Sequence, residues 1–344
     1  MIEIDGSIGE GGGQILRTAS ALSVITNKPL HVFKIRKGRK EPGLKTQHLL
    51  GLRALAQFSQ GRLEGDFLGS KEIKFWPNQN FKRNISINIP TAGSITLLLQ
   101  TLLLPGLFSQ EGLEIRFRGG ATDTFFAPTI DYFRLVFLKI LQKILPESSK
   151  IDIQIKKRGY YPEGGAELEV KIPPLKGKLN SLNLLDRGNL RKISIYSGAS
   201  ELLKERKVAE RQIAGVKEIL GKLKLPIEEF IEYHKTQCPG SNICLVAEFE
   251  NTVIGADNLG RIGKKAEEIG KEVALDLINQ EKSKACLDKH LADQILPYLA
   301  LAEGKSQVTV SEITNHCKTN IWVIEKFIKG KFEIKENSIS WTGA

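Results

Sequence analysis

The run GEGGGQILR, from Gly9 to Arg17, combines glycines, one acid and one arginine at the start of an expected helix. Glycines let the backbone approach a ligand closely, and the first N–H groups of a helix have no internal partner and attract anions. Glu10 is suited to hold a divalent cation, and Arg17 is suited to phosphate oxygens. A surface turn capped by glycines has the same pattern, so this run alone does not decide between the two.

A basic loop and one histidine are further candidates for a role in chemistry. Arg36, Arg39 and Gln47 lie in RKGRKEPGLKTQ, although a short basic run is more often a solvated turn. His316 lies just ahead of a helix expected to begin near Thr319, where unpaired N–H groups favour an anion and a neutral imidazole can attack an electrophilic phosphorus. Position alone favours a structural role for this histidine, and a helix cap or a metal ligand also fits.

These residues recur within a repeated pattern of elements. Residues 14–77 predict helix, strand, loop, helix, strand and strand; residues 91–172 repeat that order, and residues 290–341 give a shorter third copy. The loops between the strand and the second helix are expected to occupy equivalent places. They are RKGRKEPGLKTQ, GGATDTFFAP with Asp123 and Pro128, and ITNHCKTN with His316. The repeat therefore predicts that phosphate binders and a nucleophile converge.

The predicted fold class is α/β in a layered α+β arrangement. Three repeated helix-strand-helix-strand-strand units form a large domain, and a smaller α/β domain is inserted into it. The inserted region has strand KISIYSG, helix VAERQIAGVKEIL, strands near FIEYH and ICLVAEF, and a long helix ending near Ile278. The expected domains are residues 1–182 (repeats 1 and 2), residues 183–280 (the insert) and residues 281–344 (repeat 3).

Composition narrows the class of protein. The 344 residues include 50 Lys and Arg against 39 Asp and Glu, a net charge of +11 that attracts polyanions such as nucleic acid, although dispersed surface lysines have the same effect. The start MIEIDGS does not resemble a signal peptide, and no apolar stretch approaches the roughly 20 residues of a membrane span. We therefore expect a cytoplasmic protein without a membrane partner.

Two common site types are disfavoured. The four cysteines form no CxxC pair, so free thiols are expected, and a bridge between Cys238 and Cys244 is left open. No GxxxxGK[ST] run is present, and GRIGKKA at 260–266 has the wrong spacing for a P-loop.

Several separated motifs together resemble the RNA 3'-terminal phosphate cyclases. In chain order they are GEGGGQILR, RKGRKEPGLKTQHL, RGYYPEGG, HLADQ and HCKTN. The resemblance spans nearly the whole chain, and the family's fold of three repeated units plus an inserted smaller domain agrees with the repeat. The fold also resembles that of the enolpyruvyl transferases.

The resemblance implies an ATP-dependent ligase that converts an RNA 3'-phosphate to a 2',3'-cyclic phosphodiester. His316 would attack the α-phosphorus of ATP and store AMP as a phosphoramidate. The RNA 3'-phosphate would then take the AMP, and the adjacent 2'-OH would close the ring and release it. The implied substrates are ATP and RNA with a 3'-phosphate end, with Mg²⁺ or Mn²⁺ as the metal. The oligomeric state is left open.

The resemblance also implies site residues. Glu10 resembles the metal carboxylate, and the phosphate or RNA-end ligands would be Arg17, Arg36, Arg39 and Gln47. The adenylate pocket would comprise Gln100, Pro128, His290, Leu291, Ala292, Asp293 and Gln294, with Pro128 and His290 on either side of adenine.

Two other functions remain as alternatives. A non-catalytic RNA-binding relative could serve in ribosome assembly, for which the histidine would be dispensable. An enolpyruvyl transferase is suggested by the shared architecture alone, and fold similarity does not establish function.

Overall fold

The computed structural model describes residues 1–221 and 226–343. Its first repeated unit comprises β1 (Ile2–Asp5), α1 (Gly13–Thr26), β2 (Leu30–Phe33), α2 (Thr46–Ser59), β3 (Arg62–Glu64) and β4 (Ile73–Trp76). The second comprises β5 (Asn84–Ser94), α3 (Ile95–Phe108), β6 (Leu113–Ala121), a helical run of α4 (Ile130–Tyr132), the π-helical η1 (Phe133–Phe137) and α5 (Leu138–Ile144), then β7 (Asp152–Lys157) and β8 (Glu167–Ile172).

The third unit is interrupted by the insert. It comprises β10 (Asn183–Leu184), α8 (Lys289–Leu301), β16 (Ser306–Thr309), α9 (Asn315–Phe327), β17 (Gly330–Lys335) and β18 (Ser338–Gly343). The insert comprises β11 (Leu190–Ser200), η2 (Glu201–Leu203), α6 (Val208–Leu220), β12 (Ile227–His234), β13 (Ser241–Phe249), β14 (Val253–Leu259) and α7 (Ala266–Lys282). The short strands β9 (Leu179–Asn180) and β15 (Ala302–Glu303) pair with each other.

The three units share one sheet topology. Their strand orders are β1-β2-β4-β3, β5-β6-β8-β7 and β10-β16-β18-β17. In each sheet the first pair is parallel and the other two pairs are antiparallel. A parallel pair needs a crossover connection, and α1, α3 and α8 lie in those connections. In the third unit the whole insert also falls between β10 and β16. The predicted three-copy fold is therefore confirmed.

The first strand of each unit was missing from the sequence prediction. Strands β1 and β10 are only four and two residues long, and such short segments carry little periodic signal. Strand β5 runs for 11 residues, but Pro90, Thr91 and Gly93 near its end read as a turn. In the insert, β14 contains Gly255 and the polar pair Asp257-Asn258, and these residues also interrupt the apolar pattern that would predict a strand.

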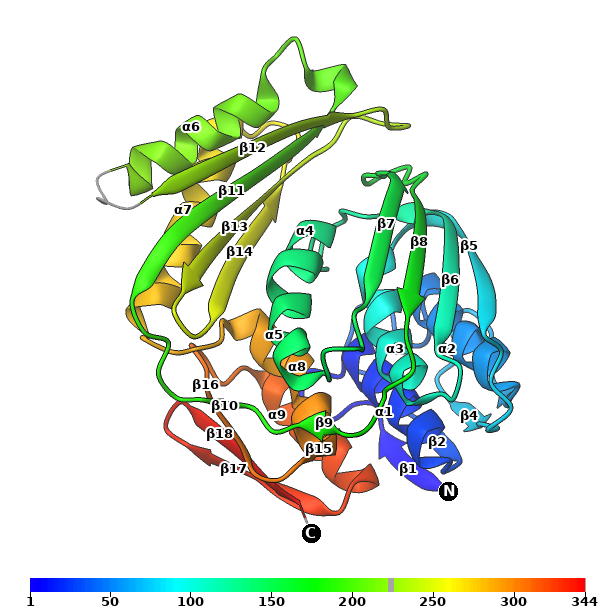
Figure 1. Ribbon diagram of the computed structural model, residues 1–344. Coiled ribbons are helices and arrows are strands. Elements are labelled where there is room, and N and C mark those ends of the chain that lie inside the picture. Colours follow the sequence, from blue (N-terminus) through cyan, green and yellow to red (C-terminus); the bar gives the residue numbers. More distant parts are fainter. Residues whose placement is uncertain (222–225, 344) are drawn as a thin grey trace.

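The helices of the three units pack together in the middle of the molecule, with their sheets around them (Figure 1). Helix α1 packs against α2, α3 and α9, and α8 packs against α9. Their apolar stripes supply a single large core that includes the fully buried Leu22, Leu102, Leu299 and Ile324. Packing of one stripe against another fixes how the N-terminal ends of these helices sit relative to each other.

The insert has a second core of its own. One face of its sheet, ordered β12-β11-β13-β14, is covered by α6 and α7 around Ile195, Leu245 and Val273 (Figure 1). The opposite face contributes Cys244 and Val246 to the large core. We propose the domain limits 1–182, 183–280 and 281–344. The two-residue β10 falls within 183–280 by position, but we assign it to the third unit because it pairs with β16.

Two further expectations concern thiols and membrane helices. Cys238, Cys244, Cys286 and Cys317 are all buried free thiols, so no bridge joins Cys238 to Cys244. Within residues 1–221 and 226–343, no helix has both the length and the apolar character needed to span a bilayer.

Candidate active site

A cavity of about 970 Å³ lies where helices from all three units meet the insert. The early turns of α1, α3, α8 and α9 all face it, through Arg17, Gln100, His290 and His316. Unpaired N–H groups and the helix dipole make each such end favourable for negative charge. Of the loop residues whose convergence the repeat predicted, Pro128 and His316 line this cavity, whereas Arg36, Arg39 and Gln47 do not.

His316 lies inside the first turn of α9, which corrects the expectation of a helix beginning near Thr319. Thr314 caps the helix by accepting a hydrogen bond from the backbone N–H of Cys317 at 3.1 Å, so the helix begins at Asn315. Nε2 of His316 lies 2.7 Å from Oε2 of Glu10, and Nδ1 lies 3.8 Å from Oδ2 of Asp293. The imidazole is thus held between two carboxylates.

The carboxylates control the charge of this imidazole. Asp293, followed by Glu10, raises the pKa of His316 above its usual value, while partial burial acts in the opposite direction. The side chain of His316 is 41% exposed, so the ring is accessible from the cavity. A histidine oriented by carboxylates at its ring nitrogens and partly exposed to a cavity is placed to react with a bound electrophile.

A glycine turn brings Glu10 to His316. Gly9 and Gly11 adopt positive φ angles of 61° and 55°, which side chains with a Cβ adopt only at a cost. A Cβ on Gly9 would also lie 2.1 Å from the hydroxyl of Thr319. The turn before α1 can therefore lie directly on α9 only because residue 9 is glycine.

Glu10 is also the candidate metal ligand. In the described part of the chain, no cluster of three or more His, Cys, Asp or Glu side chains could hold a metal ion. The carboxylate of Glu10 is partly exposed and has Arg39 at 3.5 Å as a second partner. One carboxylate together with substrate phosphates is the usual way in which proteins bind Mg²⁺, so Glu10 fits that mode.

Arg17 projects from α1 into the cavity without an ion-pair partner. Across the residues that the structure describes, no carboxylate oxygen lies within the 4 Å of an ion pair with Arg17. Burial lowers its pKa to about 10, against the opposing effect of Asp293, so the guanidinium is still charged near neutral pH. An uncompensated cation beside helix N-termini is a strong candidate to bind phosphate.

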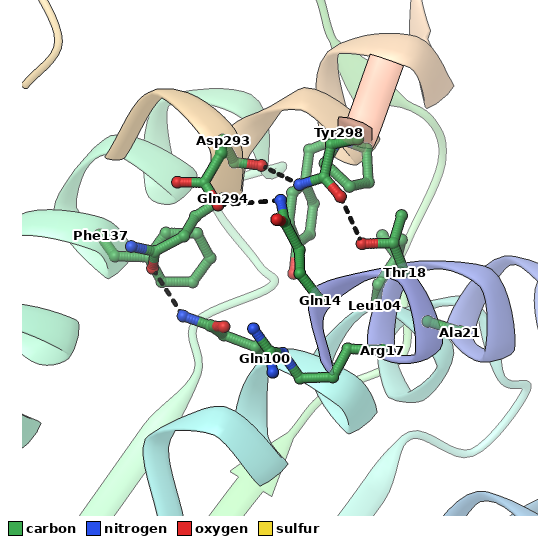
Figure 2. Close-up of a pocket in the computed structure, with 12 residues that line it drawn as sticks. Gln14, Arg17, Thr18, Ala21, Gln100, Leu104, Phe137, Asp293, Gln294 and Tyr298 are labelled. Atoms are coloured by element: carbon green, nitrogen blue, oxygen red, sulfur yellow. Dashed lines mark hydrogen bonds between the residues drawn. The ribbon is translucent and has the colours of Figure 1, made fainter. Parts of the chain in front are cut away.

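A polar network ties α1, α3, α8 and α9 together, and Figure 2 shows its Gln14–Asp293 and Gln100–Gln294 hydrogen bonds. Gln14 donates hydrogen bonds to Oδ2 of Asp293 at 3.2 Å and to the carbonyl of His316 at 3.0 Å. Asn320 donates to the carbonyl of Asp293 at 2.8 Å. Gln100 donates to Oε1 of Gln294 at 3.0 Å, which links α3 to α8. The network fixes Asp293 relative to His316.

The basic loop contributes side chains with different roles. Arg36 donates to the carbonyls of Glu41 and Gly43 at 2.8 and 3.0 Å, so it braces the loop in which it lies. Arg39 reaches Glu10, as described above. Among the residues that the structure describes, the buried amide nitrogen of Gln47 has no hydrogen-bond partner, which is costly for folding. Arg36 is thus occupied within its own loop, whereas the Gln47 amide keeps an unused donor.

His48 gives a pH-dependent prediction. Burial, followed by Arg17, Arg36 and Lys45, lowers its pKa to about 3, whereas an unfolded histidine has a pKa of about 6.5. Between those values the unfolded chain binds more protons, so this contribution to stability is complete above pH 6.5 and is lost as the pH falls. We expect His48 to lower the free energy of unfolding by up to about 1.4 kcal/mol per pH unit below pH 6.

The matching variant is His48→Gln, because glutamine at this helix position can also accept from the backbone N–H of Lys45, as Nδ1 of His48 does at 3.2 Å. Urea unfolding between pH 6 and pH 5 should show a shallower slope for the variant than for the wild type. Equal slopes in the two proteins would contradict a buried neutral His48.

The remaining predicted site residues divide between the cavity and the core. Pro128, His290 and Gln294 line the cavity. The side chains of Leu291 and Ala292 are buried in the core on the other face of α8. Leu291 and Ala292 can therefore face a ligand only with their backbone.

Asp123, expected in the convergent loops, belongs to a buried charge cluster instead. Its carboxylate accepts from Arg158 at 3.3 Å, and Arg158 also donates to Asp131 at 2.6 Å. Asn242 of β13 donates to the second oxygen of Asp131 at 2.8 Å, so the cluster joins the second unit to the insert. The expectation that Asp123 faces the site is wrong, because its charge is satisfied in the interior.

Residues of the insert, and Asp288 just after it, complete and support the cavity, and none of them was predicted as a site residue. Asp257 of β14 lines the cavity and accepts from the backbone N–H of Thr129 at 2.7 Å. Asp288 caps α8, accepts from Tyr132 at 2.6 Å and from the N–H of Gly255 at 3.0 Å, and so fixes His290 against β14. The only available signal was the run of glycine and acid in VIGADNLG.

The chain is similar in sequence to known proteins over almost its whole length. A family model described as RNA 3'-terminal phosphate cyclase matches residues 8–334. The RNA 3'-terminal phosphate cyclase of Pyrococcus abyssi is 42% identical over 334 residues, covering 97% of this chain and 95% of that protein. The protein of the same name from Saccharolobus solfataricus is 44% identical over 337 residues, covering 97% and 96%. The chain therefore belongs to the RNA 3'-terminal phosphate cyclase family.

Proposed function

We propose that this enzyme uses ATP to convert the 3'-terminal phosphate of RNA to a 2',3'-cyclic phosphodiester, through a covalent adenylate on His316. Family membership supports the cyclase activity and its class as a ligase. The observation that carries the mechanism is that His316 lines the cavity, with Glu10 at 2.7 Å and with Arg17 of the neighbouring helix α1 in the same lining.

The first step forms the covalent adenylate. Asp293 faces Nδ1, so the proton of the neutral imidazole is favoured there and Nε2 is the attacking nitrogen. Before attack, the proton on Nε2 passes by way of the Glu10 carboxylate to solvent, which leaves the lone pair of Nε2 free. Nε2 then bonds to the α-phosphorus of ATP, and the bond from that phosphorus to the bridging oxygen breaks, releasing pyrophosphate. A Mg²⁺ or Mn²⁺ ion on Glu10 would neutralise phosphate charge during this step.

The second and third steps act on RNA. An oxygen of the RNA 3'-phosphate attacks the adenylate phosphorus, the P–N bond breaks, and Nε2 regains its lone pair. The adjacent ribose 2'-oxygen then attacks the RNA phosphorus, loses its proton, and expels AMP. Because the 2'-OH and the phosphate belong to one nucleotide, closure is intramolecular and needs no further reactant.

The chain offers groups of the right chemistry for both substrates. For phosphates, Arg17 and Arg39 offer charged donors and Gln47 offers a buried amide donor. Arg36 braces the loop that carries Arg39. Pro128 and His290 line the cavity as the proposed faces for adenine, with Gln100, Asp293 and Gln294 as polar neighbours. The net charge of +11 favours association with RNA.

Two sequential assays test the proposal. The wild-type protein is incubated with Mg²⁺ or Mn²⁺ and ATP labelled on the α-phosphate, denatured, and examined for retained label that is lost in acid. The labelled protein, freed of ATP, is then given RNA with a 3'-phosphate, and the RNA end is tested for resistance to phosphatase. Retained label and a resistant end are expected.

The alternative is a non-catalytic RNA-binding protein of the same fold. A folded wild-type protein that binds RNA, but takes up no label with either metal, would support that alternative and overturn the proposed mechanism. The contact of His316 with Glu10 favours catalysis, since RNA binding alone has no need of a nucleophile beside a carboxylate.

A further inference from the structure

The cavity has an aromatic wall that the proposed chemistry does not use. Phe125 and Phe126 follow β6, Tyr161 lies between β7 and β8, and Arg261 follows β14 of the insert; all four line the cavity. We call these four residues the aromatic rim. The rings of Phe125 and Tyr161 meet edge to face, with centroids 5.6 Å apart, and the guanidinium of Arg261 lies 5.9 Å from the Phe125 centroid.

Folding alone does not account for the rim. Phe126 is fully exposed, at 102%, and Tyr161 is 54% exposed, so neither ring is needed in the core. Phe126 also has a φ of +63°, in the left-handed region that is unfavourable for a bulky residue. Strained residues of this kind tend to occur at ligand sites. An exposed, strained aromatic at a cavity points to a binding role.

The loops that carry the rings are anchored on their buried side. Tyr160, next to Tyr161, is buried, and its hydroxyl donates to Asn242 of the insert at 2.8 Å. Asp123, two residues before Phe125, is held by Arg158 at 3.3 Å. The rings are therefore presented from a fixed base, which reduces the entropy lost when a ligand stacks on them.

The size of the cavity allows two nucleotides. Ligand pockets span roughly 300–1,000 Å³, and this cavity of about 970 Å³ is at the upper end of that range. The proposed reaction requires the adenylate and the RNA terminal nucleotide to be present together. With adenine assigned to Pro128 and His290, the exposed rings remain for the second base.

We propose that the aromatic rim is a stacking subsite for the nucleobase at the 3' end of single-stranded RNA. This inference rests on the proposed function. Aromatic faces and arginine planes bind unpaired bases with little sequence preference, because every base has a π-face. The rim thus selects unpaired 3' ends, while the cations near His316 take the terminal phosphate.

The test is equilibrium binding without ATP, so that no covalent step contributes. Two short RNA oligonucleotides with a 3'-phosphate are compared, one with 2-aminopurine as the terminal base and a labelled one with an abasic terminal sugar. Stacking should quench the 2-aminopurine. The proteins are the wild type, Phe126→Gly, Tyr161→Ala, and Phe230→Ala as a control with an aromatic that is exposed on β12 outside the cavity.

Base stacking contributes about 1–3 kcal/mol by alanine substitution, so each rim variant should bind the 2-aminopurine RNA about 10-fold more weakly and quench it less. Abasic RNA should bind all four proteins with equal affinity, and Phe230→Ala should match the wild type. Phe126→Gly relieves the positive φ, so its melting temperature should not fall below that of the wild type.

Two results would overturn the stacking subsite. One is an equal loss of affinity for normal and abasic RNA. The other is unchanged RNA binding with weaker ATP binding, which would assign the rings to the purine of ATP. The labelling assay reports separately on the proposed function. Covalent label without base-dependent RNA binding would refute only the stacking subsite. Base-dependent RNA binding without covalent label would refute only the adenylate mechanism.

Discussion

Replacing His316 with alanine is expected to reduce covalent attachment of AMP by at least about 10³-fold, because removal of a nucleophile eliminates the step it performs. Conversion of RNA 3'-phosphate should fall by a similar factor. The ring is 41% exposed, so its loss should leave the fold intact. Labelling with α-phosphate-labelled ATP measures the first effect, and phosphatase resistance of the RNA end measures the second.

His31→Ala is a matched control for that experiment. His31 on β2 also faces two carboxylates, with Nδ1 3.3 Å from Glu3 and Nε2 2.8 Å from Glu72, but it does not line the cavity. Its variant should retain wild-type labelling. Acid-labile label that persists in folded His316→Ala would place the adenylate on another residue and refute the role given to His316.

Arg158→Met is expected to lower the free energy of unfolding by about 3–5 kcal/mol, the range for breaking a buried ion pair on one side. The side chain of Arg158 is 5% exposed and lies between Asp123 and Asp131. Burial alone would lower the pKa of Arg158, but Asp131 and Asp123 together raise it. Without the guanidinium, two buried carboxyl groups would lack a counter-charge and Asn242 would lose a fixed partner.

Urea unfolding at neutral pH measures this effect, and Arg83→Met supplies the comparison. Arg83 pairs with Glu114 at 3.0 Å, but its side chain is 56% exposed, so its loss should cost less than about 1 kcal/mol. Similar costs for the two arginines would show that the buried cluster adds no stability beyond a surface pair. Arg158→Met, unlike Arg83→Met, should also weaken RNA binding if the buried cluster anchors the aromatic rim.

The periodic elements of the fold were predictable from the sequence. Helix α6 was predicted at its observed bounds, Val208–Leu220. It has an apolar face whose spacing is set by the helix itself. Elements without a period were missed: β1 and β10 are too short, and β14 has polar residues whose partners, Thr129 and Glu272, lie outside its sheet.

For the site, residue types and order made Glu10, Arg17 and His316 candidates, and the resemblance to the cyclases implied the role of each. Their geometry was not available from the sequence. Glu10 and His316 are 306 positions apart, and their 2.7 Å contact depends on Gly9 lying against α9. The aromatic rim could not be predicted for the same reason, since its four residues come from three separate loops.

The sequence by itself determined the local elements, the threefold repeat and the chemical groups available, since those follow from residue type and short-range spacing. Only the tertiary structure decided which groups meet. It placed Asp123 in a buried ion pair with Arg158 and His316 in the first turn of α9, and it brought Asp257 and Arg261 of the insert to the cavity. Packing of distant elements sets burial and distance, and these decide whether a charged side chain stabilises the interior or faces a ligand.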